Sequence, residues 1–135
     1  MIGLDTNVLL RLFIDDDVEP CRRARAFVDE AARKEPCLVN SVVLAEFAWV
    51  LLKALKRPKG EVIEYLEGLL EAADLEIERR PAARGALASY RSGKADFSDY
   101  LLAHLNVALG CTSTATFDEE ALRFSIFSPV PKELP

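Results

Sequence analysis

The sequence predicts an α/β domain built on a parallel sheet, and three observations support this fold class. Short apolar segments typical of strands alternate with longer segments whose apolar residues recur at helical spacing. No internal repeat or low-complexity linker divides the chain. Its 135 residues are 50% hydrophobic, enough for one apolar core. We therefore expect a single domain over residues 1–135, in which helices flank a central, mainly parallel sheet.

Each of the first two predicted strands is followed by a helix. Residues 2–4 form the first strand, and the helix after it has Thr6 as its candidate N-cap. Residues 15–17 form an acidic turn, and the next helix has Pro20 near its start and Phe27 on its inward face. Ala24, Val28 and Ala31 share that face with Phe27.

The second strand, residues 37–40, leads into a strongly apolar helix that Ser41 is expected to cap. The inward-facing residues of this helix are predicted to be Val43, Leu44, Phe47, Val50, Leu51 and Leu55. Pro58 ends it, and residues 59–73 form another helix. The inward residues of this helix are predicted to be Val62, Leu66, Leu69 and Leu70. Residues 75–78 alternate apolar and acidic side chains, which is typical of an edge strand.

The C-terminal part continues the alternation of helices and strands. Glycines end its two longer helices, at Gly93 and Gly110. The elements expected here are helices 81–91 and 96–109, strand 111–115, a short helix at 118–123 and a last strand at 124–127.

Charge and cysteine content limit the function classes. The net charge of −5 gives no general attraction to a polyanion, so a nucleic-acid role requires a local basic patch or metal ions. Cys21, Cys37 and Cys111 have no paired spacing, which favours buried thiols in a reducing cytoplasm over a disulfide framework or a zinc site. No apolar stretch approaches the roughly 18 residues that a membrane span needs, and we expect no secretory signal.

Five acidic residues are placed where a parallel sheet binds its ligands, beyond the carboxyl ends of the strands. Asp5 ends the first strand, Glu46 lies one turn into the helix after the second, and Asp118 follows a later strand. Asp96 and Asp99 start a helix. Carboxylates held close together repel unless a divalent cation neutralises them, and oxygen ligands favour Mg²⁺ or Mn²⁺. Such a site suits phosphodiester hydrolysis.

Each acid also has a purely structural interpretation. Asp5 can cap the helix that follows it, and the cap and ligand roles do not exclude each other. Asp96 fits a cap better than a ligand, whereas Asp99, one turn further on, fits a ligand better. Glu46 lies among apolar neighbours, which favours a ligand over a solvated residue, and Asp118 can be explained by the helix dipole alone.

Four segments together resemble PIN-domain ribonucleases, in particular the VapC-type toxins of toxin–antitoxin pairs: LDTN, the isolated Glu46, ADFSDYLLA and TFDEEAL. The resemblance implies a PIN-like three-layer sandwich and a Mg²⁺- or Mn²⁺-dependent endoribonuclease acting on RNA. It also implies a homodimer and a protein antitoxin that covers the acidic pocket. The implied metal ligands are Asp5, Glu46, Asp99 and Asp118, with Asp96 as an auxiliary acid and Thr6, Asn7 and Thr116 as polar supports.

Two further hypotheses concern the substrate contacts and the alternatives to a nuclease. Arg91 and Lys94, just before the acidic helix, are the first candidates to meet RNA phosphates. A phosphatase with an aspartyl nucleophile would normally need a second acid where Asn7 stands. A phosphoacceptor receiver domain would need paired acids near its first strand and a partner lysine late in the chain, and neither is apparent. A catalytically inert PIN-like module that binds nucleic acid or protein is the last alternative.

Overall fold

Parallel strand pairing is common to both sheets of the computed structural model, which describes residues 1–14 and 18–133. β1 (Cys37–Val39) pairs with β2 (Leu75–Ile77), and β3 (Thr114–Thr116) pairs with β4 (Phe127–Pro129). The predicted α/β class with parallel pairing is confirmed, although the described strands form two two-stranded sheets where one was expected. The acidic turn expected at 15–17 lies outside the described residues.

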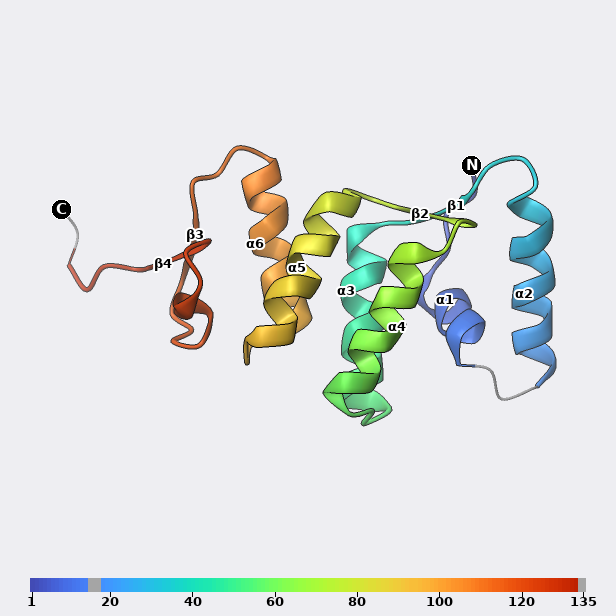
Figure 1. The fold of residues 1–135 in the computed structure, drawn as a ribbon, viewed down its shortest axis with the longest axis horizontal. Coiled ribbons are helices and arrows are strands. Elements are labelled where there is room, and N and C mark those ends of the chain that lie inside the picture. Colours follow the sequence, from blue (N-terminus) through green and yellow to red (C-terminus); the bar gives the residue numbers. More distant parts are fainter. Residues whose placement is uncertain (15–17, 134–135) are drawn as a thin grey trace. The chain divides into compact units, whose positions relative to one another are not determined.

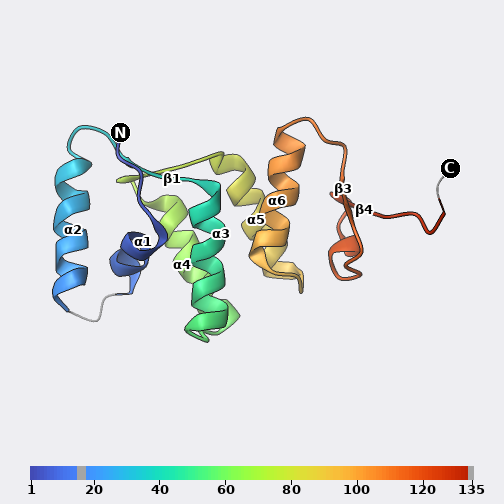
Figure 2. The ribbon, with the colours of Figure 1, turned by 180° about the vertical axis from the view of Figure 1, so that it is seen from behind.

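The chain folds as two compact units, Met1–Arg80 and Pro81–Pro135, whose positions relative to one another are not determined. In the first unit, Figures 1 and 2 show α1 between α2 and α3. Apolar residues from these helices and from α4 form its core, and the Phe13 and Phe47 rings meet edge to face at 5.8 Å. The helical elements of this unit are α1 (Thr6–Phe13), α2 (Glu19–Ala31), α3 (Ser41–Trp49), the π-helix η1 (Val50–Ala54) and α4 (Lys59–Glu71).

The predicted strand at residues 2–4 is reduced to one parallel bridge between Gly3 and Leu38. Two hydrogen bonds make this bridge: Leu4 N–H donates to the Leu38 carbonyl at 2.9 Å, and Leu38 N–H donates to the Ile2 carbonyl at 2.8 Å. The bridge fixes the direction in which the chain enters α1.

The caps of α1 and α3 are the last extended residues before each helix. Of the two candidate caps of α1, Asp5 and Thr6, Asp5 is the cap, because its backbone is extended and its Oδ1 accepts the Val8 N–H at 3.1 Å. Asn40, not Ser41, caps α3 in the same way, accepting the Val43 N–H at 2.9 Å. In both cases the side chain of the last extended residue reaches forward to the first turn of the helix.

The helix after β1 widens at its end, which changes the side chains that it buries. Leu44, Phe47 and Leu51 are buried as predicted. In η1, however, Leu55 N–H donates to the Val50 carbonyl, and this wider turn rotates Leu55 outward, so its predicted inward position is wrong. The inward position predicted for Phe27 on α2 is also wrong, since its side chain is 49% exposed beside α1.

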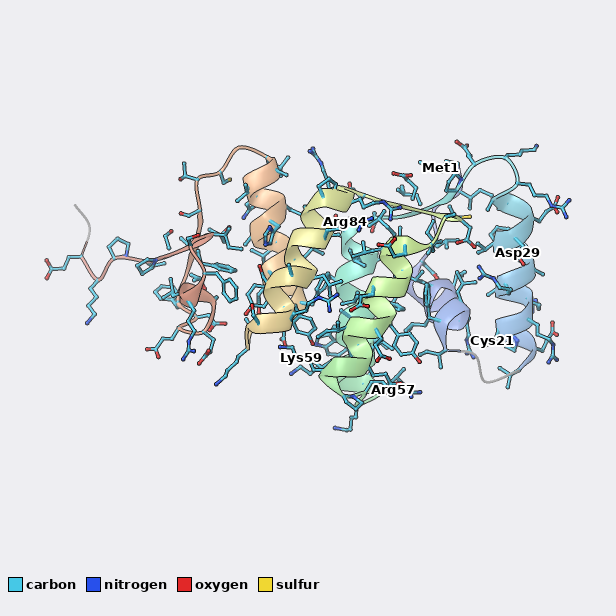
Figure 3. The ribbon with its side chains drawn as sticks, in the orientation of Figure 1. Met1, Cys21, Asp29, Arg57, Lys59 and Arg84 are labelled. Carbon is cyan, nitrogen blue, oxygen red and sulfur yellow. The ribbon has the colours of Figure 1, made fainter. Side chains whose placement is uncertain are left out.

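Side chains also hold the ends of the first-unit helices in place. Near the start of α2 (Figure 3), the Cys21 thiol donates to the Ile14 carbonyl at 3.4 Å. At the start of α4, Arg57 pairs with Glu61 at 3.0 Å. The inward residues predicted for α4, including Leu66 and Leu69, are all buried.

In the second unit, α5 (Arg80–Ser92) and α6 (Phe97–Ala108) approach closely at a glycine. A Cβ built on Gly85 would lie 2.6 Å from Nδ1 of His104, so only glycine fits at this distance. Ser89 Oγ lies 3.0 Å from the His104 Nε2, and burial lowers the pKa of this half-buried histidine. His104 is thus part of the contact between the two helices.

Both C-terminal strands begin three residues later than predicted, because turns occupy their expected starts. Gly110 takes a φ of 101°, and Cys111 N–H donates to the Asn106 carbonyl, so Cys111 belongs to the end of α6 and is exposed rather than buried. Phe127 N–H donates to the Phe124 carbonyl in a similar turn. Between the strands, only the 3₁₀ turn η2 (Ala121–Arg123) replaces the expected short helix.

All three cysteines are free thiols. Within the part of the chain that the structure describes, no helix is both long and apolar enough to cross a membrane.

We predict that Gly85→Ala lowers the free energy of unfolding by about 1–3 kcal/mol, because its methyl group would press on the His104 ring. Gly60→Ala, at a helical position with nothing within 4 Å, is the matched control and should be neutral or stabilising by up to about 1 kcal/mol. Urea unfolding followed by circular dichroism measures both. Equal behaviour of the two variants would contradict the close contact at Gly85.

Candidate active site

In the first unit, the start of α1 and the middle of α3 meet through a hydrogen bond between predicted site residues. Thr6 is 8% exposed, and its Oγ1 donates to Oε1 of Glu46. Asp5 precedes Thr6 and uses Oδ1 to cap α1. Asn7 is exposed on the next position. The fold therefore joins Thr6 to Glu46 at the end of the Gly3–Leu38 bridge, with Asp5 directly before Thr6.

In the second unit, Asp96 and Asp99 form a capping box at the start of α6. The Asp96 N–H donates to Oδ2 of Asp99 at 3.2 Å. The cap role predicted for Asp96 is confirmed. Asp99 is the other member of this capping box, so its hydrogen bond to the Asp96 N–H orients its carboxylate.

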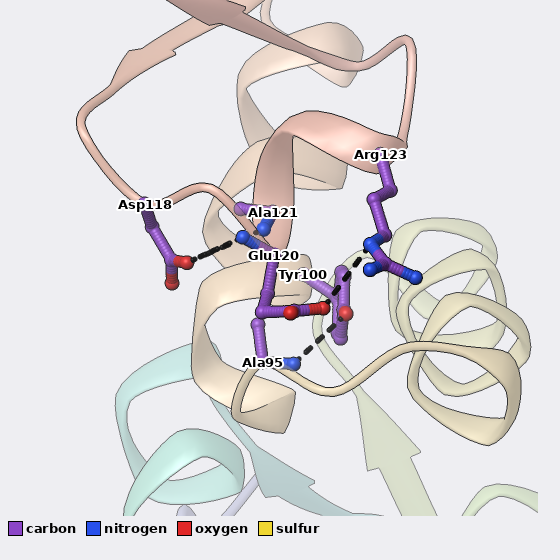
Figure 4. Close-up of polar contacts among 6 residues, drawn as sticks. All are labelled: Ala95, Tyr100, Asp118, Glu120, Ala121 and Arg123. Atoms are coloured by element: carbon purple, nitrogen blue, oxygen red, sulfur yellow. Dashed lines mark hydrogen bonds and ion pairs between the residues drawn. The ribbon is translucent and has the colours of Figure 1, made fainter.

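Asp118 is held by a similar set of bonds on the segment after β3. Its N–H donates to Oγ1 of Thr116 at 3.0 Å, and its Oδ1 accepts the N–H groups of Glu120 at 2.9 Å and Ala121 at 3.4 Å (Figure 4). Thr116 thus contacts the backbone of Asp118, not its carboxylate. These bonds fix the carboxylate of Asp118 just past the end of a strand.

The three acids of the second unit interact electrostatically. Burial is the main cause that raises the pKa of Asp99. The hydrogen bond from Asp96 N–H lowers it, whereas the negative charges of Asp96 and Asp118 raise it again. Asp99 is therefore a half-buried carboxylate whose charged form is destabilised by its surroundings, and an all-oxygen group of this kind suits Mg²⁺ or Mn²⁺.

The predicted site residues thus fall into two groups, one in each unit. The first holds Asp5, Thr6 and Glu46, and the second holds Asp96, Asp99, Thr116 and Asp118. Within residues 1–14 and 18–133, no cluster of three or more His, Cys, Asp or Glu is arranged to hold a metal ion. Arg91 and Lys94 are exposed at the end of α5 and in the turn before α6.

A family model for the PIN domain matches residues 2–126. The chain belongs to the PIN domain family. PIN domains are generally metal-dependent nucleases, and the matched range includes both groups of acids. Comparison with curated proteins gave no match, and comparison with solved structures gave none.

One residue beside the acids of this PIN domain was missed at the level of sequence. Tyr100 is fully buried next to Asp99, whereas Glu120, part of the TFDEEAL segment, pairs with Arg123 at 3.3 Å (Figure 4). A tyrosine followed by two leucines in a helix has the pattern of an ordinary core residue. Only its position directly after Asp99 was available as a signal.

We predict that Asp99→Asn stabilises the metal-free protein at neutral pH. The folded state disfavours the charged form of Asp99. The side chain therefore contributes most to stability below its ordinary pKa of 3.8, where it is protonated, and this contribution is lost as the pH rises through the raised pKa. The amide oxygen of asparagine still accepts the Asp96 N–H. Thermal unfolding should show a higher Tm for the variant at pH 7 and no gain below about pH 3.8.

Glu119→Gln is the control for this measurement, because Glu119 is an exposed acid next to Asp118. Its effect should stay within about 0.5 kcal/mol. A lower Tm at pH 7 for Asp99→Asn than for the unaltered protein would contradict the prediction, because it would show that the charged Asp99 carboxylate stabilises the folded state.

Proposed function

We propose that this PIN domain is a metal-dependent endoribonuclease that hydrolyses RNA phosphodiester bonds. Asp5, Glu46, Asp99 and Asp118 bind Mg²⁺ or Mn²⁺, and Asp96 is an auxiliary acid. The observation that carries the proposal is the environment of Asp99, where burial and two neighbouring carboxylates all oppose the negative charge. A divalent cation removes this penalty, since it turns the repulsion among the acids into a shared attraction.

The polar supports keep the ligands in a fixed geometry. The Thr6 hydroxyl donates to Glu46, which otherwise would be free to rotate on the surface of α3. The backbone donors at η2 hold Asp118, and the capping box holds Asp99. A bound Mg²⁺ or Mn²⁺ lowers the pKa of a coordinated water and stabilises negative charge on the phosphate oxygens.

RNA binding by a chain with a net charge of −5 requires local cations. Arg91 and Lys94 are exposed just before the acidic helix, and in this proposal they contact the phosphates next to the cleaved bond. Weakening of RNA binding as the salt concentration rises follows from this arrangement.

We further propose that the protein is a VapC-type toxin of a type II toxin–antitoxin module. The segments LDTN, ADFSDYLLA and TFDEEAL support this finer assignment. It implies a cytoplasmic homodimer and an antitoxin that covers the acidic pocket. Light scattering tests the dimer, and a short open reading frame directly upstream would support the antitoxin.

We predict that Asp5→Asn and Asp99→Asn each lower RNA cleavage by about 100-fold or more, because each removes a charged ligand of the metal. Glu119→Gln should cleave as the unaltered protein does. Cleavage of a labelled single-stranded RNA with and without Mn²⁺ gives the rates, and circular dichroism checks that the variants are folded.

Two results would contradict the proposal. Cleavage that persists in both aspartate variants would exclude this metal site. No cleavage by the folded, unaltered protein with any RNA class, together with no Mn²⁺ binding at millimolar concentration, would favour the catalytically inert binding module.

A further inference from the structure

Tyr100 connects three segments of the second unit, and two of them carry the proposed metal ligands. It follows Asp99 directly on α6 and is fully buried. Its hydroxyl contacts the turn that precedes α6, and its ring contacts the segment that follows Asp118.

The hydroxyl holds the turn before α6. Tyr100 Oη accepts the N–H of Ala95 at 3.1 Å, and this bond is buried (Figure 4). Ala95 directly precedes Asp96, whose own N–H donates to Asp99. The bond therefore closes a loop of six residues over the start of the helix and limits the movement of the capping box.

The ring holds the segment after Asp118. Tyr100 packs edge to face against Phe124 at 5.0 Å and Phe127 at 6.3 Å between ring centroids. Phe124 follows η2 directly, and its N–H donates to the carbonyl of Ala121. Since Ala121 N–H donates in turn to Asp118, the chain of contacts runs without a gap from the Tyr100 ring to the Asp118 carboxylate.

Gly93 makes this contact tight. A Cβ at Gly93 would lie 2.7 Å from Cζ of Tyr100 and 2.8 Å from the Phe124 ring. Both distances are too short for any side chain, so Tyr100 and Phe124 occupy the space that glycine leaves. Burial is the main cause that raises the pKa of Tyr100, and the negative charges of Asp118, Asp99 and Glu120 raise it further. Three carboxylates therefore lie near this one side chain.

We propose that Tyr100 is a positioning residue that fixes Asp99 and Asp118 relative to each other, so that both carboxylates bind one divalent metal ion. The proposal rests on the proposed function. Each aspartate is already held locally, Asp99 by the capping box and Asp118 by η2. Tyr100 supplies what these local bonds do not, a fixed separation between the two elements. Outer groups that orient metal ligands change metal affinity by about 10–100-fold when they are removed.

The test measures Mn²⁺ binding to the full chain by calorimetry, without RNA, for Tyr100→Phe and Gly93→Ala. Tyr100→Phe keeps the ring but leaves the Ala95 N–H without its acceptor. Gly93→Ala presses a methyl group against the hydroxyl and the ring of Tyr100. We expect the Mn²⁺ dissociation constant to rise about tenfold in each. We also expect kcat for RNA cleavage to fall, with KM little changed.

Three matched controls separate positioning from simple loss of stability. Tyr65→Phe and Gly60→Ala make the same chemical changes on α4 and should bind Mn²⁺ as the unaltered protein does. Leu101→Ala removes buried core volume on α6 and should lower the Tm without weakening Mn²⁺ binding. If Gly93→Ala does not fold by circular dichroism, Tyr100→Phe decides the outcome.

The outcomes distinguish this inference from the proposed function. Unaltered Mn²⁺ affinity in Tyr100→Phe, with binding and cleavage intact in the parent protein, would overturn the role of Tyr100 alone. If Leu101→Ala weakens Mn²⁺ binding as much as Tyr100→Phe does, the effect of Tyr100 is one of core stability and not of positioning. No Mn²⁺ binding and no cleavage by the parent protein would overturn the proposed function, and the role of Tyr100 with it.

Discussion

Backbone N–H groups at the starts of helical turns hold three of the four proposed metal ligands. Asp5 accepts from Val8, Asp99 from Asp96, and Asp118 from Glu120 and Ala121. In each of these three carboxylates, a single oxygen accepts these bonds. Capping therefore orients each carboxylate while leaving an oxygen for a metal ion.

Because of these bonds, the helix-cap role and the proposed metal-ligand role of these acids are compatible. A cap stabilises a helix by about 0.5–2 kcal/mol with one oxygen, so a carboxylate can cap and coordinate at once. Glu46 is the exception, because it stands inside α3, where all backbone N–H groups are used. Its orientation comes from the Thr6 hydroxyl, which links the middle of α3 to the first turn of α1.

Much of the local structure followed from the sequence pattern. The helical periodicity predicted the buried faces of α3 and α4, including Leu44, Phe47 and Leu66. The cap role of Asp5 was one of its two predicted roles. The cap of α3 is Asn40 in place of the predicted Ser41, because periodicity does not show which polar residue at a helix start has extended backbone. Leu55 points outward because of the π-helical turn before it, and an apolar sequence pattern does not predict a π-helix.

The late strands and the contacts of the candidate site were less predictable. Gly110 was expected to end α6, but the strand after it starts later than predicted. Cys111 N–H donates back to the Asn106 carbonyl, and this bond depends on the left-handed conformation of Gly110, not on strand propensity. The acids and their order along the chain were visible in the sequence. The bond between Thr6 and Glu46 and the contacts of Tyr100 join residues far apart in the chain or hidden in an apolar helix, so only the folded structure shows them.

Anomalous diffraction from crystals grown with Mn²⁺ is the most direct measurement of the central claim, that these carboxylates share a divalent cation. The predicted result is a manganese peak with oxygens of Asp5, Glu46, Asp99 and Asp118 among its ligands, directly within about 2.5 Å or through one coordinated water. A manganese ion bound elsewhere, with Asp5 and Asp99 too far apart to share any ion, would contradict it.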